Sequence, residues 1–266
     1  MESNLILSIA AVAAMIPATA MAWRTNASRG SIFWLLLAVA LSGTASWVWV
    51  GFSQGWRTGF APTLWVTVCA TLAVFGIVAA VARDGFRLAS VLMPYLLVLG
   101  ILATVWLNSP EQPLRGDAAV GWLDAHIAFS LATYAILTLA ALAGFSAFAQ
   151  ERALKRKAQG RMTRALPGLS SAEALESSLL TLGAAVLAIG VVTGMAVDYL
   201  TTGALFHVSH KTMFALLALA VVFALLIARR TVGLRGRQAA RLVMLAYLLL
   251  TLGYPGVKFV TDVLVQ

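Results

Sequence analysis

Three histidines, His126, His207 and His210, are the side chains of this 266-residue chain best suited to bind a metal-containing group. Imidazole is a leading protein ligand for haem iron and for transition metals. Ionisable side chains are also costly beside lipid, so histidines in a chain that crosses a membrane tend to mark functional sites. The predicted membrane spans put all three on the same side of the bilayer. Two imidazoles from separate helices could fill both axial positions of a haem iron, with apolar side chains covering the porphyrin.

The composition indicates a membrane protein, because 61% of the residues are hydrophobic and only 11% are charged. A typical soluble domain has about 25% charged residues. Apolar runs of about 20 residues, long enough to cross about 30 Å of hydrocarbon, predict transmembrane helices. These runs are apolar on every side, whereas barrel strands alternate in polarity. We therefore expect an all-α, polytopic integral membrane helical bundle of about eight transmembrane helices, at residues 5–23, 31–51, 60–82, 88–107, 122–149, 175–197, 211–228 and 242–263.

The positive residues predict the orientation of this bundle. Fifteen of the 19 Lys and Arg residues lie in the connections after the first, third, fifth and seventh spans. Cytoplasmic loops carry such an excess, so both termini are predicted to be non-cytoplasmic. The same distribution accounts for the net charge of +9 without a nucleic-acid partner. The fifth span is nearly thirty residues long and is predicted to project beyond the bilayer on one side.

The candidate site is predicted at the non-cytoplasmic ends of the later spans. His126 opens the fifth span, and Ser130 and Tyr134 follow at four-residue steps, so the three share one stripe of the helix. Ser130 and Tyr134 are expected to orient the imidazole of His126. The connection at 198–212 supplies His207 and His210.

Two further features near these histidines have alternative interpretations. Lys211 could pair with a haem propionate, or its side chain could snorkel to the membrane interface. Tryptophans near the same ends of the helices could cover a porphyrin, or they could anchor the protein at the interface, as tryptophan does in many membrane proteins. These tryptophans are Trp47, Trp49, Trp56, Trp65, Trp106 and Trp122.

The stretch from Gly121 to Ala135, GWLDAHIAFSLATYA, resembles the His-x-x-x-Ser-x-x-x-Tyr-Ala helix of the cytochrome c assembly proteins of the CcsA type. Two later stretches match in order. Leu175-Glu176, followed by Gly183, Gly190 and Thr193-Gly194, resembles the family's next helix, and His210-Lys211-Thr212 resembles the start of the helix after that. The resemblance covers about residues 60 to 260 and is greatest to the YpjD-like branch of inner-membrane proteins.

The resemblance implies that the protein handles haem at the outer membrane face, where the family presents haem for attachment to cytochrome c. By similarity, His126 is an axial ligand. The family's tryptophan-rich signature is replaced by residues 202–209, and its second external histidine has no counterpart before Gln266. His210 or His207 is the expected substitute. We therefore expect haem b as cofactor, Ser130, Tyr134, Lys211 and Trp122 around it, and a binding or assembly role rather than catalysis. The expected location is the bacterial inner membrane, with other membrane subunits of cytochrome c assembly as partners.

We expect residues 1–266 to form a single membrane domain, with a cytochrome c assembly-like core at 60–263 and two additional transmembrane helices within 1–59. A transporter is disfavoured because Asp84, Asp124, Asp198 and Asp262 all lie near span ends rather than at mid-membrane. A hydrolase or transferase is disfavoured because its motifs are absent from the sequence. The alternative that stays open is a scaffold or accessory subunit without haem, with Gly190 and Gly194 forming a helix contact.

Overall fold

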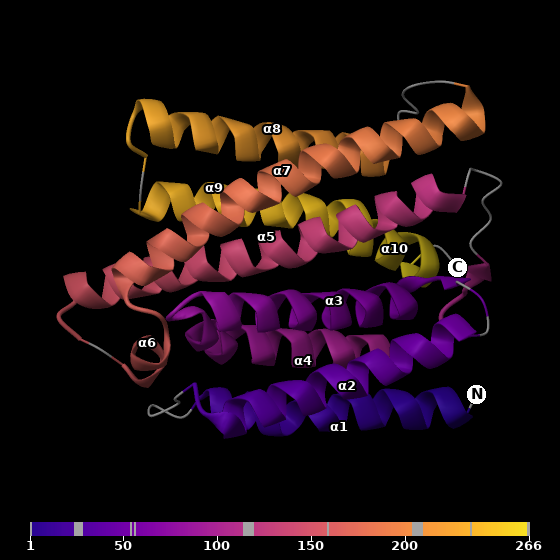
Figure 1. Ribbon diagram of the computed structural model, residues 1–266, viewed down its shortest axis with the longest axis horizontal. Helices are drawn as coiled ribbons and strands as arrows, with labels where there is room; N and C mark the ends of the chain where they lie inside the picture. The colour runs from indigo at the N-terminus through magenta and orange to yellow at the C-terminus, as the bar shows by residue number, and fades with distance from the viewer. Residues whose placement is uncertain are drawn as a thin grey trace.

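The computed structural model describes residues 2–23, 29–53, 55, 57–113, 120–158, 160–203, 210–234 and 236–264. In this part of the chain, seven helices are long and apolar enough to cross a membrane. They lie side by side along the long axis of the molecule (Figure 1). This confirms the prediction of an all-α polytopic membrane bundle. Their bounds are α1 (Glu2–Ala22), α2 (Ser31–Ser53), α3 (Phe60–Val81), α4 (Ala89–Val105, preceded by the 3-10 turn η1, Gly85–Leu88), α5 (Val120–Lys155), α7 (Leu169–Thr202) and α8 (His210–Thr231).

The last predicted span, 242–263, is an interrupted helix. The helix α9 (Gly236–Thr251) gives way to the π-helical segment η2 (Leu252–Gly256), which contains Pro255. The short helix α10 (Val257–Phe259) and the π-helical segment η3 (Val260–Leu264) follow. Proline has no backbone N–H and clashes with the preceding turn, so it interrupts regular α-helical hydrogen bonding. Pro255 predicts a bend in this span, and the structure has a widened, irregular π-helical backbone there.

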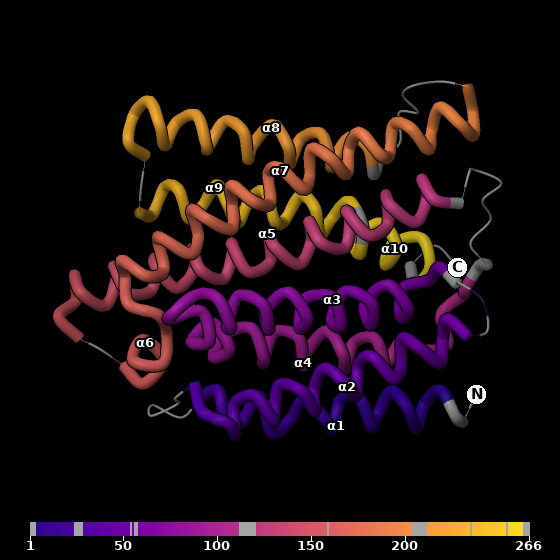
Figure 2. Tube along the Cα trace, in the orientation of Figure 1, coloured from indigo at the N-terminus to yellow at the C-terminus, as the bar shows by residue number. Residues whose placement is uncertain are grey.

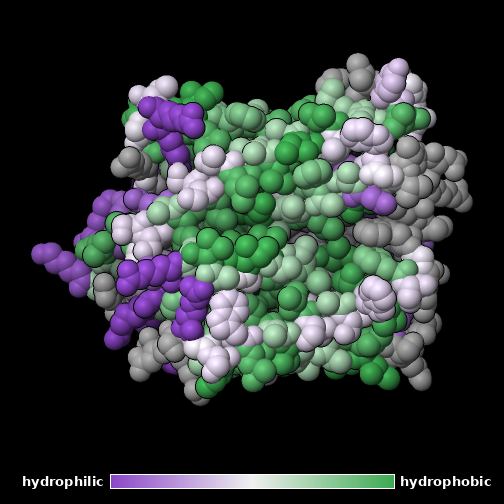
Figure 3. Space-filling model, viewed as in Figure 1, coloured by the Kyte–Doolittle hydropathy of each residue, from purple (hydrophilic) through white to green (hydrophobic). Residues whose placement is uncertain are grey.

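The helices form two packed groups. One contains α1 to α4, and the other contains α5, α7, α8 and α9 (Figure 2). The helix α5 joins the groups, because it packs against α7 and α9 on one side and against α3 on the other. Fully buried aliphatic and aromatic side chains fill the shared core, among them Leu72, Phe75, Leu96, Leu137 and Leu180. The apolar side chains on the outside cover the flanks of the bundle (Figure 3), as a lipid-facing surface requires.

The two ends of the bundle differ in polarity. Hydrophilic side chains gather at the end that carries the short helix α6 (Arg161–Ala165), which we call the basic end (Figure 3). Both termini lie at the opposite end, which we call the outer end (Figure 1). There the strand β1 (Arg57–Thr58) pairs antiparallel with β2 (Gln112–Pro113). The helix α5 has 36 residues and is about 54 Å long at 1.5 Å per residue, so it projects beyond a bilayer core, as predicted.

The helix α7 begins at Leu169, next to the restart predicted at Ser170 after Pro167-Gly168, but it continues further than predicted at its outer end. Residues 198–202 were expected in a connection, but they continue the helix to Thr202. The hydroxyls of Thr201 and Thr202 donate to the carbonyls of Val197 and Asp198 one turn earlier. The helix ends where Gly203 adopts a positive φ of 73°, which glycine tolerates without a steric penalty. The predicted connection is therefore correspondingly shorter.

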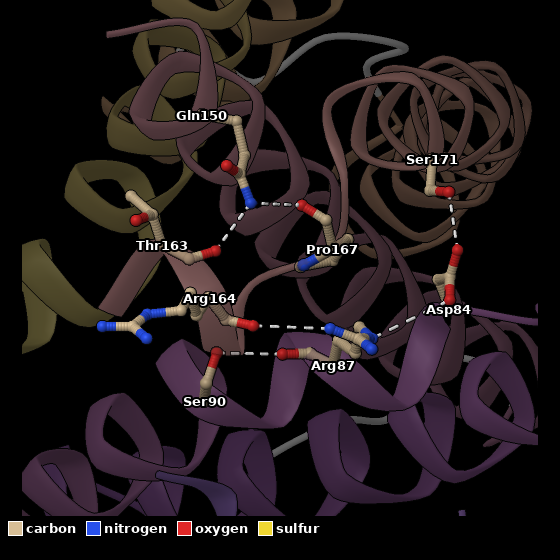
Figure 4. A network of polar contacts seen from close by, with 8 residues as sticks. All are labelled: Asp84, Arg87, Ser90, Gln150, Thr163, Arg164, Pro167 and Ser171. Carbon is tan, nitrogen blue, oxygen red and sulfur yellow. Dashed lines mark hydrogen bonds and ion pairs between the residues drawn. The ribbon is translucent and has the colours of Figure 1, made fainter. Parts of the chain in front are cut away.

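The connection between α5 and α7 is held down at the basic end by a polar network (Figure 4). The buried amide of Gln150 donates hydrogen bonds to the carbonyls of Thr163, at 2.7 Å, and Pro167, at 3.0 Å. The hydroxyl of Ser171 donates to Asp84 at 2.6 Å, which ties the start of α7 to the α3–α4 turn. The guanidinium of Arg87 donates to the carbonyl of Arg164 at 3.4 Å, so the connection is fixed to both helix groups.

Replacing Gln150 with methionine is expected to loosen this connection. The thioether has similar length but cannot donate, so the carbonyls of Thr163 and Pro167 lose their shared donor. We expect trypsin to cleave between residues 160 and 165 several-fold faster. Cleavage rates in detergent measure this, with replacement of the exposed Gln238 by methionine as the matched control. Equal rates in both variants and the parent would contradict the proposed restraint.

Candidate haem pocket at the outer end

A cavity of about 360 Å³ lies between α5, α7, α8 and the junction of α9 with η2. Its size lies within the range of small-molecule sites, which is roughly 300–1,000 Å³. On α7 its lining extends from Leu187 to Asp198, about 16 Å along the helix. The helix α5 contributes His126 near one end and Thr133 and Tyr134 near the other. We call this cavity the outer pocket, because its polar end with Asp198 faces the outer end of the bundle.

The imidazole of His126 is oriented by the backbone of α7. Its Nδ1 lies 3.0 Å from the carbonyl oxygen of Gly190 and 3.4 Å from the hydroxyl of Thr193. A carbonyl oxygen only accepts hydrogen bonds, so Nδ1 carries the proton and Nε2 keeps its lone pair. The hydroxyl of Thr193 itself donates to the same carbonyl at 2.9 Å. Since Nε2 lies across the ring from Nδ1, it faces away from Gly190. This is how a metal-binding histidine is commonly held.

Gly194 makes room for the imidazole ring. A Cβ added at this position would lie 2.9 Å from Cε1 of His126, which is closer than real Cβ atoms approach other atoms, and 3.2 Å from Nδ1, which is a tight contact. At Gly190 the nearest atom to an added Cβ is the Cβ of Phe129 at 3.8 Å, an ordinary contact. The Gly190 and Gly194 pair, which the sequence suggested as a helix contact, therefore has a second use. Gly190 supplies a carbonyl acceptor, and Gly194 supplies space.

Ser130 and Tyr134 line the outer pocket, but the contacts of Tyr134 differ from the prediction. The Tyr134 hydroxyl bonds to those of Tyr247, at 3.0 Å, and Thr251, at 3.3 Å, and lies 3.4 Å from that of Tyr95. Tyr95 and Tyr247 also bond to each other. This cluster ties α4, α5 and α9 together beside the pocket. The expectation that Tyr134 orients His126 is wrong, because the orienting groups belong to Gly190 and Thr193.

The predicted aromatic cover is not seen around this cavity. Within the described residues its lining contains no tryptophan or phenylalanine, and aliphatic side chains such as Leu131, Leu187 and Leu216 take their place. Trp47 and Trp65 stack 5.5 Å apart in the other helix group. Trp122 is 47% exposed near the start of α5 and does not line the cavity. A contact of Trp122 with haem stays a prediction.

The other two histidines cannot be compared with the prediction. His207 falls within 204–209, outside the described residues, and His210 and Lys211 open α8 but have side chains outside the described set. Thr212, which follows directly, lines the outer pocket. Among the side chains that are described, no group of three or more His, Cys, Asp or Glu could hold a metal ion. Among the described side chains of the pocket, His126 is therefore the one imidazole positioned to bind a metal.

The fold and this pocket together define a polytopic helical membrane protein with an imidazole facing an apolar cavity near one membrane face. The chain belongs to the family described as cytochrome C assembly protein, which it matches over residues 35–265. This confirms the resemblance and extends it into α2. The family associates the protein with haem-related cytochrome biogenesis.

A relative of similar length supports a shared architecture along almost the whole chain. The protein is 44% identical over 269 residues to the "Uncharacterized 28.8 kDa protein in nifR3-like 5'region" of Azospirillum brasilense, which covers 99% of both chains. No solved structure matches the chain significantly. The match includes the two N-terminal helices that were predicted to lie outside the family core. The division at residue 60 stays a prediction.

Proposed function

We propose that this protein binds haem b in the outer pocket, at the periplasmic face of a bacterial inner membrane, as a haem-handling factor of cytochrome c assembly. The observation that carries the proposal is the hydrogen bond from His126 Nδ1 to the carbonyl of Gly190 at 3.0 Å. This bond leaves Nε2 free to bind iron and makes the imidazole a stronger ligand. The largely aliphatic lining suits a porphyrin.

The second axial ligand would come from α8. His210 is the first residue of this helix, two positions before Thr212, which lines the pocket. Because Nδ1 of His126 faces the Gly190 carbonyl and Nε2 is left for the iron, a ligand on the far side of the iron would come from another element that lines the pocket. We propose His210 for this position, with His207 as the alternative and Lys211 as a partner for a propionate. When bound, haem supplies an iron that accepts axial ligands and exchanges electrons.

The charge distribution supports the periplasmic location. The outer end lies opposite the basic end, where residues 150–174 alone carry six of the 19 Lys and Arg residues of the chain. The positive-inside rule assigns the basic end to the cytoplasm. Haem held at the outer end would be accessible to periplasmic apocytochromes and to other membrane subunits of cytochrome c assembly. The alternative function, a scaffold without haem, is less favoured because it gives no role to the oriented imidazole of His126.

The visible spectrum of the detergent-purified protein from haem-sufficient cells tests this function. We expect a low-spin spectrum in both oxidation states, lost in His126→Ala and in His210→Ala. The variant His207→Ala separates the two candidates for the second ligand. Since a variant can fail for reasons of folding, each alanine variant is also measured with free imidazole. Imidazole should restore the spectrum in the His126→Ala variant. Colourless protein that takes up no added haem would reject the proposal in favour of the scaffold.

A further inference from the structure

Five exposed cationic side chains gather at the basic end, on the last turn of α5 and on the connection to α7. We call them the cationic patch, and they are Arg152, Arg156, Lys157, Arg161 and Arg164. Residues 150–172 contain one acidic side chain, Glu151, which pairs with Lys155. Among the residues that the structure describes, none of the five forms a salt bridge. The patch therefore carries positive charge that the described part of the protein does not neutralise.

The α6 part of the patch is held at the membrane surface. Arg87 lies in the η1 turn, after α3 has ended and before α4 begins, and such turns between apolar spans lie at the bilayer boundary. Its guanidinium donates to the carbonyl of Arg164, and the buried amide of Gln150 donates to that of Thr163. These bonds fix α6 beside the ends of α3 and α4 (Figure 1). Met162, between the two arginines of α6, is 43% exposed, which suits the boundary between headgroups and hydrocarbon.

Lys157 occupies a backbone position that favours glycine. Its φ is 51°, and it is the only non-glycine residue with a positive φ in the described part of the chain. Its N–H donates to the carbonyl of Leu154 at 3.1 Å, and that of Ala158 donates to the carbonyl of Ala153 at 3.2 Å. These two bonds close the turn in which helices commonly end on glycine. A side chain there costs free energy, so a lysine at this position indicates a use for its charge.

We propose that the cationic patch binds the headgroups of anionic phospholipids in the leaflet at the basic end. A phosphate offers negative charge and oxygen acceptors, which arginine and lysine bind through charge-assisted hydrogen bonds. The positive-inside rule accounts for basic residues at this end, but it does not require that they be fixed in place or occupy a glycine position. A phospholipid is favoured over an acidic protein, because lipid phosphates are always present where α6 lies. The proposal does not depend on haem, since the outer pocket lies at the other end of the bundle.

The test compares two lipids, dioleoylphosphatidylglycerol and dioleoylphosphatidylcholine, added to the full-length protein in a neutral detergent. Native mass spectrometry measures the affinity for each lipid. The parent should prefer phosphatidylglycerol, and Arg161→Gln with Arg164→Gln should lower this preference about 10–30-fold, or about fivefold for each cation. The matched control, Arg230→Gln with Arg241→Gln, removes two exposed arginines from α8 and α9 at the same end. Its preference should stay close to that of the parent.

Lys157→Gly gives a second readout. Without added lipid it should unfold at a higher temperature than the parent, because glycine adopts a positive φ without a steric penalty. Its preference for phosphatidylglycerol should nevertheless fall about fivefold. Equal losses in the two double variants would show that only the net charge of the basic end matters, and this would overturn the proposal. A parent without a preference for phosphatidylglycerol would also overturn it, in favour of an acidic protein as the partner of this surface.

Discussion

Replacing Gly194 with alanine is expected to weaken haem binding by about 10–100-fold, as loss of a group that orients a metal ligand typically does. The new methyl group would lie 2.9 Å from Cε1 and 3.2 Å from Nδ1 of His126. The ring must then move, and its Nδ1 bond to the carbonyl of Gly190 is stretched or broken. Haem affinity measured by absorbance titration of the purified protein checks this.

The chain provides a matched control one turn away. Gly190→Ala adds the same methyl group on the same helix, but its nearest neighbour is Phe129 at 3.8 Å, and the carbonyl that holds His126 is unchanged. We expect this variant to bind haem within about threefold of the parent, because ordinary van der Waals contacts cost little. Both variants should remain helical by circular dichroism. Equal losses at the two positions would show that Gly194 matters only for helix packing.

Replacing Glu176 with leucine is expected to destabilise the protein by about 3–5 kcal/mol, the usual cost of removing one partner of a buried ion pair. Glu176 on α7 is 2% exposed, and its Oε1 lies 2.7 Å from Nη2 of Arg229 at the end of α8. The pair also lies against α5, because the same oxygen is 3.3 Å from the position of an added Cβ on Gly144. The variant would leave the guanidinium of Arg229 buried without its counter-charge.

Two further variants isolate the role of this ion pair. The double variant Glu176→Leu with Arg229→Met should recover most of the lost stability, because it removes both charges and leaves apolar side chains of similar size. Glu151→Gln, which breaks the exposed pair with Lys155, should cost about 1 kcal/mol or less. Thermal unfolding in detergent, followed by tryptophan fluorescence, measures all three. A double variant no more stable than Glu176→Leu alone would contradict the ion-pair explanation.

The bundle itself was predictable because membrane insertion is a local property of the chain. A run of about 20 apolar residues forms a helix in lipid, whatever its neighbours, since no water is available to satisfy its backbone groups. Seven of the predicted spans accordingly match helices of the structure. The errors fall where local polarity does not decide the backbone. Asp198 and Thr202 suggested a connection, but their backbone continues α7. Pro255 predicted a bend in the last span, but not the π-helical segments found there.

The candidate site was predicted in part. His126 was identifiable because a histidine at the start of an apolar helix is rare and costly. Its partners were not, because Gly190 and Thr193 belong to another helix and act through a carbonyl and a hydroxyl. The glycine spacing was visible, but it did not indicate that an imidazole fills the space beside Gly194. The sequence did not single out Thr133, because whether its buried hydroxyl has a hydrogen-bond partner depends on the residues that pack around it.

The sequence by itself determined that this chain is a helical membrane protein, which segments cross the bilayer, and which family it resembles. These properties depend on the polarity of single segments and on motifs within them. Only the tertiary structure decided that α7 supports the imidazole of His126, that Tyr134 belongs to a cluster with Tyr95 and Tyr247, and that Glu176 pairs with Arg229. Each of these contacts joins residues from different helices. Their geometry depends on how the helices pack, which no single segment specifies.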